Sequence, residues 1–431
     1  PRFTGKEAKF ELLSDSHNIA IVGLEWYFNE RNPGSEAYQG PQGGEPFFAL
    51  RNAGNFLLED CVMNFASEGI IFQGSEVMRN CEVRRCIILN TYNGNEDVPR
   101  EQATRDDRWE DRSSGTWHSY VDGILYEDCV FHHNGWHETA GLGRSLFSHN
   151  QYLSYGVKNL ENRNNIISRA GSHGTQMRSG GTLENNLYLY NPIGAFLNGD
   201  LGDGESGNNE ALYNVFIGSE NMSPGNGFPR GLGLDLTATD AGGHFIGNLG
   251  LDQDNPAGLN RAFLDGNISS VDGIQARGQT IVRDNIVYNW LNADGEGIDI
   301  KPHEEPYFTI GENVVQGRTL TGERVRFRDP DRRIDDYMEA AGFPGEDWED
   351  LIRRAASRPL GVWSDEYAFN PRIINAFIRE GFVREGQDFF DASRFLLAFG
   401  MHGGSKTITV ESEAVWSLQN EAEWFSVNPP S

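Results

Sequence analysis

Residues 164–189, NNIISRAGSHGTQMRSGGTLENNLYL, contain the pattern that decides the fold. In this stretch a polar residue followed by Asn stands before a short apolar run twice, at Asn165 and at Asn186. The same pattern, with Cys or Asn in the second position, recurs along much of the chain, at Cys61, Cys86, Cys129, Asn214, Asn248, Asn285 and Asn313. A motif that recurs every few tens of residues is typical of a solenoid, in which each repeat is one coil.

The coils are predicted to consist of strands. Runs of β-prone residues such as Thr175–Met177 and Leu187–Leu189 are too short for helices, and Gly, Asn and Ser separate them. An Asn at the same turn of successive coils can bond to the copies above and below it, since stacked strands lie about 4.8 Å apart. We therefore expect an all-β parallel β-helix with an asparagine ladder. Three cysteines fill the ladder position as buried thiols rather than as disulfides: Cys61, Cys86 and Cys129.

The composition agrees with a narrow, stacked core and restricts the partners. Of 431 residues 51 are Gly, and only 38% are hydrophobic. The formal net charge of -27 argues against nucleic acid and anionic membranes as partners, because both need a basic face. No apolar stretch is long enough to span a bilayer. The chain begins Pro1-Arg2-Phe3, and we expect a mature protein, secreted or periplasmic, that has lost its export signal.

A change of pattern along the chain predicts two parts. Residues 1–325 carry the coils, with insertions at 92–116 and 199–210 that we expect to be loops. Residues 326–431 show helical spacing in places and are expected to form a small helical cap and a C-terminal tail. Because a solenoid needs its open ends covered, we expect the helical segment to cover one end.

One strand of each coil, the front strand, is predicted to carry the functional side chains. Alternation along a strand sends the neighbours of the inward residues to the outer face. With Val121, Leu153, Met177 and Leu197 inward, one outer column is Tyr120, Tyr152, Gln176 and Phe196, and the other is Asp122, Ser154, Arg178 and Asn198. Three histidines stand at the start of successive front strands: His118, His149 and His173. Two aspartates, Asp235 and Asp265, follow on later coils. A purely structural face does not need so many His, Tyr, Asp and Arg side chains on adjoining coils. Their concentration therefore indicates a functional site.

The loop after the Cys129 strand contains further aromatic residues: His132, His133, Trp136 and His137. It forms either a wall of the same site or a hydrogen-bonded loop that does not touch substrate. The residues alone favour neither alternative.

The coil pattern, the asparagine ladder and the front strands resemble the right-handed parallel β-helix superfamily of pectate lyases, related polysaccharide lyases, epimerases and phage tailspikes. Segments 118–122, 131–136, 148–152 and 173–181 are also similar to secreted bacterial β-helix proteins that act on polysaccharides. The resemblance implies a right-handed β-helix whose substrate lies along the front sheet. The chain departs from the pectate lyase pattern because it lacks a clear calcium-binding carboxylate cluster, and the epimerase sequence Asp-Pro-His-Asp is absent.

The predicted activity is β-elimination on a uronic-acid-containing, alginate-like polysaccharide, an anionic partner. This reaction needs a cation for the sugar carboxylate, a base for the C5 proton and an acid for the leaving oxygen. Arg178 fits the first role, because its guanidinium binds both carboxylate oxygens. Tyr152 or His149 is the base, and His173 or His118 is the acid. The predicted substrate-binding residues are Tyr120, Asp122, Gln176, Asn150, Asn198, His133 and Trp136.

Two other functions stay open at this point. Glycoside hydrolysis needs two carboxyl groups flanking one bond, and Asp122 is the best candidate, with Asp200, Asp203 or Asp235 as its partner. A non-catalytic carbohydrate-binding spike would use the same His and Tyr residues only to contact sugars. No metal site is predicted and no cofactor is required, although calcium stays open as a substitute for Arg178. The oligomeric state is also left open.

Overall fold

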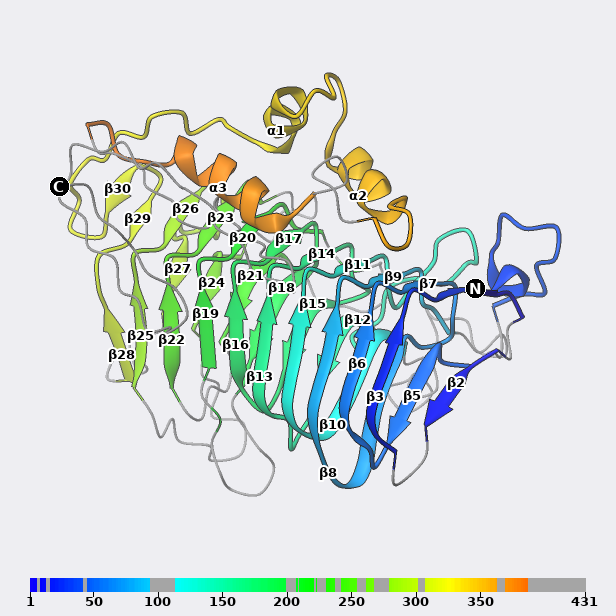
Figure 1. The fold of residues 1–431 in the computed structure, drawn as a ribbon. Helices are drawn as coiled ribbons and strands as arrows, with labels where there is room; N and C mark the ends of the chain where they lie inside the picture. Colours follow the sequence, from blue (N-terminus) through cyan, green and yellow to red (C-terminus); the bar gives the residue numbers. More distant parts are fainter. Residues whose placement is uncertain are drawn as a thin grey trace, which may run out of the picture.

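The computed structural model is a right-handed parallel β-helix in which successive coils stack along one axis (Figure 1). Each regular coil contributes one strand to each of three sheets. The structure describes residues 1–5, 8–12, 16–41, 45–93, 113–198, 207, 209–220, 222, 230–236, 242–253, 261–266, 279–300, 307–362 and 369–386, without the side chains of 74–77. Most of both predicted insertions, and the tail from residue 387, lie outside the described residues.

The front sheet contains the strands predicted to carry the site. Its members are β2 (Phe10–Leu12), β5 (Phe48–Arg51), the first halves of β8 (Ile70–Arg84) and β10 (Ser114–Glu127), β12 (His149–Leu153), β15 (His173–Met177), β18 (Ile193–Leu197), β21 (Leu232–Asp235), β24 (Leu264–Asp265) and β27 (Ile298–Asp299). All these pairings are parallel, as stacked coils require.

The second sheet follows the front sheet in each coil. It contains β3 (His17–Val22), β6 (Gly54–Glu59), the second halves of β8 and β10, β13 (Lys158–Arg163), β16 (Gly181–Glu184), β19 (Asn209–Leu212), β22 (Gly243–Ile246), β25 (Thr280–Arg283) and β28 (Phe308–Ile310).

The third sheet closes the coil. It contains β1 (Arg2–Phe3), β4 (Glu25–Tyr27), β7 (Val62–Asn64), β9 (Ile87–Leu89), β11 (Val130–His132), β14 (Ile166–Ser168), β17 (Leu187–Leu189), β20 (Val215–Ile217), β23 (Leu249–Leu251), β26 (Ile286–Tyr288), β29 (Val314–Val315) and the antiparallel β30 (Arg318–Thr319). A short 3-10 helix, Asn29–Arg31, follows β4.

The repeated polar pair forms the turn between the second and third sheets. Its first residue has a left-handed backbone, with φ of 56° at Asn164 and 51° at Asn185, which Asn tolerates better than most residues. Its second residue is the ladder asparagine, whose Oδ1 accepts a hydrogen bond from the preceding coil, 2.9 Å from Asn165 N to Asn186 Oδ1. The same backbone bond repeats at Asn165, Asn214, Asn248, Asn285 and Asn313. The ladder prediction is confirmed.

The cysteines extend this ladder toward the N-terminal coils. Cys129 Sγ lies 3.4 Å from the backbone nitrogen of Cys86 and takes the place of an asparagine oxygen. All four cysteines are free and buried, so packing rather than disulfide formation explains them.

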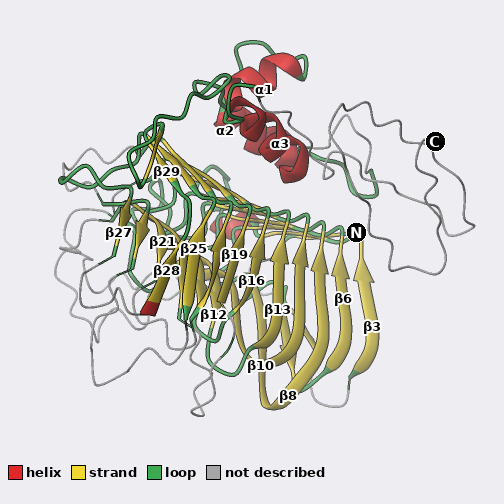
Figure 2. Ribbon diagram, turned by 90° about the vertical axis from the view of Figure 1, so that its left-hand side faces the viewer, coloured by secondary structure: helices red, strands yellow, loops and turns green. Residues whose placement is uncertain are grey.

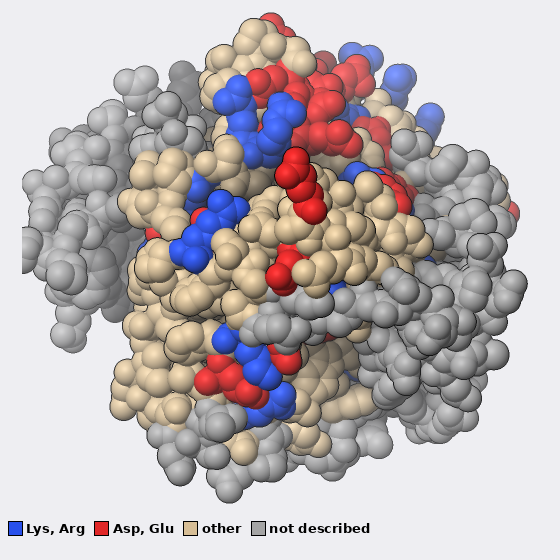
Figure 3. Space-filling view, turned by 90° about the vertical axis from the view of Figure 1, so that its right-hand side faces the viewer, with Lys and Arg blue, Asp and Glu red and all other residues tan. Residues whose placement is uncertain are grey.

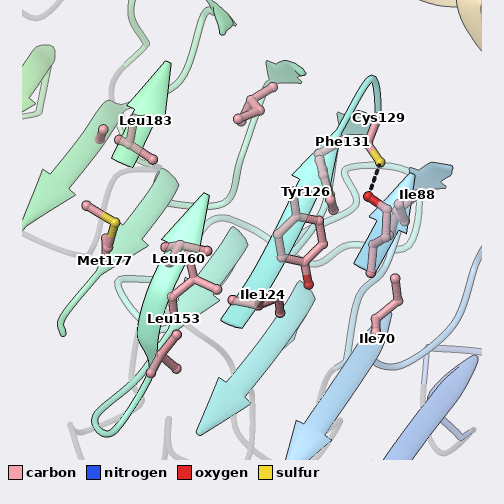
Figure 4. Close-up of a cluster of buried hydrophobic side chains, with 14 of the residues drawn as sticks. Ile70, Ile88, Ile124, Tyr126, Cys129, Phe131, Leu153, Leu160, Met177 and Leu183 are labelled. Atoms are coloured by element: carbon pink, nitrogen blue, oxygen red, sulfur yellow. Dashed lines mark hydrogen bonds between the residues drawn. The ribbon is translucent and has the colours of Figure 1, made fainter. Parts of the chain in front are cut away.

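Inside the coils, apolar side chains stack in columns. Leu153, Met177 and Leu197 occupy equivalent inward positions of the front sheet, and each is fully buried. Leu160 and Leu183 face them from the second sheet (Figure 4). Each buried side chain of this kind contributes about 1.5 to 3 kcal/mol, so the core draws its stability from many small, equal layers.

The helical segment packs on the β-helix, but it lies along the third sheet rather than across an open end (Figures 1 and 2). Its helices are α1 (Ile334–Ala340), α2 (Trp348–Ala356) and α3 (Pro371–Gly381). Their apolar residues bury the outer face of the third sheet, where Val130, Ile166 and Leu187 stand on successive coils. The predicted division of the chain at residues 325 and 326 remains a prediction.

Polar anchors fix this segment to the turn that carries the ladder. Asn375 donates to the backbone oxygen of Asn185, and Arg379 donates to that of Asn214. Arg358 and Asp60 form a buried ion pair, 3.2 Å long. In the described part of the chain no helix combines the length and the apolar character needed to cross a bilayer.

The face at the N-terminal end carries acidic and basic side chains in mixed groups (Figure 3). In the first coils Glu11 pairs with both Lys9 and Arg51. On this face the charges therefore offset one another rather than form one basic surface.

Candidate functional site

One outward column of the front sheet carries aromatic, amide and acidic side chains. Strand pairing aligns Trp117, Tyr152, Gln176, Phe196, Asp235, Asp265 and Asp299 on successive coils. The predicted order from Tyr152 to Phe196 is correct, and strand pairing adds Asp235 and Asp265 to this column. Sequence reasoning did not include Asp299.

The prediction for β10 was out of register. Trp117 rather than Tyr120 pairs with Tyr152, because β10 turns the corner between the front and second sheets at a single residue. That residue is Tyr120, which has a left-handed backbone with φ of 57°. The next coil uses the longer turn 154–157 at the same corner. Val121 follows this corner and belongs to the second-sheet half of β10, whereas Leu153 precedes the corner in its own coil. An alignment of Val121 with Leu153 therefore moves the front half of β10 by three residues.

This shift places His118 inside the coil instead of on the front face, which corrects its predicted role. His118 is fully buried, its ring lies 4.5 Å from that of Phe72, and its Nδ1 accepts a hydrogen bond from Phe72 N. A further hydrogen bond joins its Nε2 to the hydroxyl of Tyr126. Burial lowers the pKa of His118 to about 3, so this imidazole is a neutral part of the core.

Asp122 and Asn150 also lie away from the predicted positions. Asp122 begins the second-sheet half of β10, pairs with Lys158 and accepts a hydrogen bond of 2.6 Å from Asn159. Asn150 is fully buried and belongs to a second asparagine stack, in which it bonds Asn134 and Asn191. These partners give Asn150 a structural role at the turn that enters the front sheet.

The loop that follows β11 was expected to be either a wall of the site or a hydrogen-bonded loop. Its contacts fit the hydrogen-bonded loop. His133 Nε2 lies 2.6 Å from Glu138, and its Nδ1 lies 2.7 Å from Asn90 Oδ1. Trp136 donates its indole N–H to the backbone oxygen of Arg169, and the guanidinium groups of Arg144 and Arg169 lie near its ring. Both side chains are less than one-tenth exposed. Their contacts bind the loop to itself and to neighbouring coils.

Four predicted residues do come together on the front sheet. His149 and His173 stand on adjacent coils with their Nδ1 atoms 3.1 Å apart. The His149 ring centroid is 5.1 Å from that of Tyr152. Arg178 lies beside Tyr152, with its guanidinium carbon 5.8 Å from the ring centroid. Two buried imidazoles, a half-buried phenol and a cation are therefore adjacent on two neighbouring coils.

The surroundings of His173 favour its neutral form. Burial, helped by His149, Arg230 and Arg178, lowers the pKa of His173 well below its usual range. Because the two Nδ1 atoms are within hydrogen-bond distance, one ring donates and the other accepts. In the tautomer in which His149 donates, its Nε2 carries the lone pair that a general base needs.

Tyr155 was missed by sequence reasoning. It lies in the turn after β12, and its hydroxyl accepts a hydrogen bond of 3.1 Å from Arg178. The guanidinium carbon of Arg178 is 5.6 Å from the Tyr155 ring and so lies near two tyrosines at once. The position of Tyr155 could have indicated a place in the site, because it comes two residues after a front strand. The sequence comparison used only inward strand residues and left this turn out.

The remaining predicted residues frame this cluster. Gln176 and Asn198 are outward and nearly buried, on the two coils that follow Tyr152. Asp235, Asp265 and Asp299 come next, and Arg261 lies 3.7 Å from Asp265. Among the described residues no group of three His, Cys, Asp or Glu side chains forms a metal site. Asp200 and Asp203 lie outside the described residues.

No family model and no curated protein sequence matches this chain. Among solved structures, the Dettilon tailspike protein is similar over 70% of this chain, with 11% identity and a TM-score of 0.25. Tailspike protein 3 of bacteriophage CBA120 is similar over 77% of this chain, with 12% identity and a TM-score of 0.21. The chain spans only 61% and 58% of the lengths of those two proteins. The assignment as a parallel β-helix therefore rests on the strand pairing itself.

Proposed function

We propose that the protein cleaves a uronic-acid-containing, alginate-like polysaccharide by β-elimination on its front sheet. The observation that carries this proposal is the contact of Tyr152 with both His149 and Arg178. Elimination needs a base, an acid and a cation for one sugar unit, and here all three occupy adjoining coils. The same proposal places the protein outside the cytoplasm, where such polysaccharides occur.

In this mechanism Arg178 binds the carboxylate of the reacting uronate and makes the C5 proton more acidic. Nε2 of His149 takes that proton. The C5–H electrons form the C4=C5 double bond, the C4–O bond breaks, and the Tyr152 hydroxyl protonates the leaving oxygen. The protonated His149 then returns a proton to Tyr152, so neither water nor a co-reactant is consumed.

His173 acts as a positioning residue in this proposal, not as the acid. Its Nδ1 lies 3.1 Å from that of His149 and 3.0 Å from Ser172 Oγ, and this bonding fixes the ring of its neighbour. Tyr152 is half-buried, whereas His149 is 2% and His173 6% exposed, so the phenol is the best placed of the three to reach the leaving sugar oxygen. The proposal therefore requires the C5 proton to come against the edge of the His149 ring.

The test is a set of variants assayed on alginate and other polyuronates for the ultraviolet absorbance of the unsaturated product. Arg178→Ala and His149→Gln should each lower kcat by about a hundredfold or more. Asp122→Asn is the control, because this carboxylate lies on the second sheet, and it should retain wild-type turnover. Full activity of Arg178→Ala on every polyuronate tested would exclude the proposed role of the cation.

Hydrolysis is the second candidate, favoured by a different observation. Asp235, Asp265 and Asp299 occupy one outward column on adjacent coils. Coils are about 4.8 Å apart, close to the roughly 5 to 5.5 Å between the carboxyl groups of a retaining hydrolase. In this alternative Asp235 and Asp265 replace the pair centred on Asp122. New reducing ends without ultraviolet absorbance, abolished by Asp235→Asn or Asp265→Asn, would support it.

A further inference from the structure

Two exposed tyrosines stand beside the proposed site, at the corner between the front and second sheets. The Tyr120 side chain is 52% exposed and that of Tyr155 is 39% exposed. They occupy this corner on successive coils, because Tyr120 N lies 3.4 Å from the backbone oxygen of Tyr155. Large aromatic rings of this kind are normally buried, and an exposed adjacent pair indicates a contact surface.

The backbone holds Tyr120 in place. Its φ of 57° is a conformation that costs a bulky residue about 1 kcal/mol or more. Its ring lies against Gly156 so closely that a Cβ there would come within 2.7 Å of Tyr120 Cδ1. The ring therefore rests on the backbone of the next coil and needs no further ordering to bind a ligand.

Tyr155 connects this corner to the proposed catalytic residues. Arg178 donates a hydrogen bond to the Tyr155 hydroxyl and lies near the rings of both Tyr155 and Tyr152. Arg178 thus links the side chains of Tyr155 and Tyr152, and a backbone hydrogen bond places Tyr120 of the preceding coil next to Tyr155.

We infer that Tyr120 and Tyr155 form a subsite for the pyranose ring next to the sugar whose carboxylate Arg178 binds. A pyranose has an apolar face of C–H groups and a rim of hydroxyls, which match an aromatic ring that ends in a hydroxyl. This inference rests on the proposed function and names a second sugar position for the same substrate. The alternative is that the rings only pack on glycine.

Tyr213 supplies a matched control for that alternative. It is also 52% exposed, has φ of 55° and lies against Gly247, where a Cβ would come within 2.6 Å of its ring. However, Tyr213 lies at the turn between the second and third sheets, away from the front sheet. The same substitution at Tyr120 and at Tyr213 therefore separates sugar binding from packing.

The experiment is affinity electrophoresis of the full chain in native gels that contain alginate, polygalacturonate or hyaluronan, with KM and kcat measured in parallel. Wild type and Tyr213→Ala should be retarded equally by one polyuronate, whereas Tyr120→Ala and Tyr155→Ala should bind it about tenfold more weakly, with raised KM. Tyr155→Phe keeps the ring and loses the Arg178 bond, so it should keep the retardation and lower kcat. Thermal unfolding of each variant verifies the fold.

The outcomes separate the two proposals. Retardation that depends on Tyr120 and Tyr155 but yields no unsaturated product supports the subsite and contradicts the elimination. Unsaturated product with equal retardation and KM in Tyr120→Ala, Tyr155→Ala and wild type contradicts the subsite and leaves the elimination intact. Equal losses in Tyr120→Ala and Tyr213→Ala, or no retardation of wild type by any of the three polyuronates, also overturns the subsite.

Discussion

Removal of one ladder asparagine, in Asn186→Ala, should destabilise the solenoid by about 2 to 6 kcal/mol. The Asn186 Oδ1 accepts hydrogen bonds from the backbone nitrogen of Asn165 at 2.9 Å and from its side chain at 3.1 Å. Its Nδ2 donates to Asn162 O at 2.7 Å and to Asn214 Oδ1 at 3.1 Å. Alanine leaves two buried backbone groups without these partners, each costing about 1 to 3 kcal/mol.

The control for this variant is Asn55→Ala. Asn55 belongs to an exposed row of asparagines on the second sheet, where its side chain bonds Asn18 and Asn80. Water replaces those bonds, and the left-handed backbone of Asn55 makes alanine cost about 1 kcal/mol. Equilibrium urea unfolding, followed by circular dichroism, measures both variants. A loss for Asn186→Ala no greater than for Asn55→Ala would refute the reasoning that buried backbone pairing makes the ladder essential.

Three further predictions follow from the contacts. Arg178→Lys should keep the charge but lose bidentate binding of the carboxylate. We expect kcat on the active polyuronate to fall about tenfold, which is less than in Arg178→Ala. Equal losses of kcat in the two variants would contradict a bidentate role. His118 has a native pKa of about 3 and an unfolded pKa of about 6.5, so the unfolded state binds the extra proton and stability falls below about pH 6.5, by about 2 kcal/mol at pH 5. Urea unfolding of His118→Gln should show a smaller loss of unfolding free energy between pH 7 and pH 5 than the wild type does. The same pH dependence in both proteins would contradict a buried, neutral His118. Arg358→Met leaves Asp60 without its buried partner and should increase proteolysis of the helical segment by about tenfold or more, whereas cleavage at the wild-type rate would show that this anchor is dispensable.

The coil architecture was predictable because its determinant is local. A left-handed residue followed by a ladder asparagine or cysteine recurs from coil to coil, so the repeat is visible in residues such as Asn164 and Asn165. The side chains of the front column were also largely predictable from alternation, as Tyr152, Gln176 and Phe196 demonstrate.

The main error arose at the corner between the front and second sheets. Val121 follows this corner, whereas Leu153 precedes the corresponding corner of the next coil, so aligning the two inward residues moved the front half of β10 by three positions. The residue that pairs with Leu153 is His118, which therefore points inward. The position of the helical segment had a signal that was overlooked. Ile87–Leu89 and Leu187–Leu189 are apolar at every position and therefore buried on both faces, which indicates that something covers the third sheet.

The most direct test of the central claim is to mix the wild-type protein with a panel of uronic-acid polysaccharides and follow ultraviolet absorbance and reducing ends together. Elimination predicts that both rise in parallel on at least one substrate, because each cleavage creates one conjugated double bond and one reducing end. Reducing ends without absorbance would contradict elimination and favour the aspartate column of Asp235 and Asp265. If neither signal rises on any polyuronate, the cluster of Tyr152, His149 and Arg178 is not a lyase site.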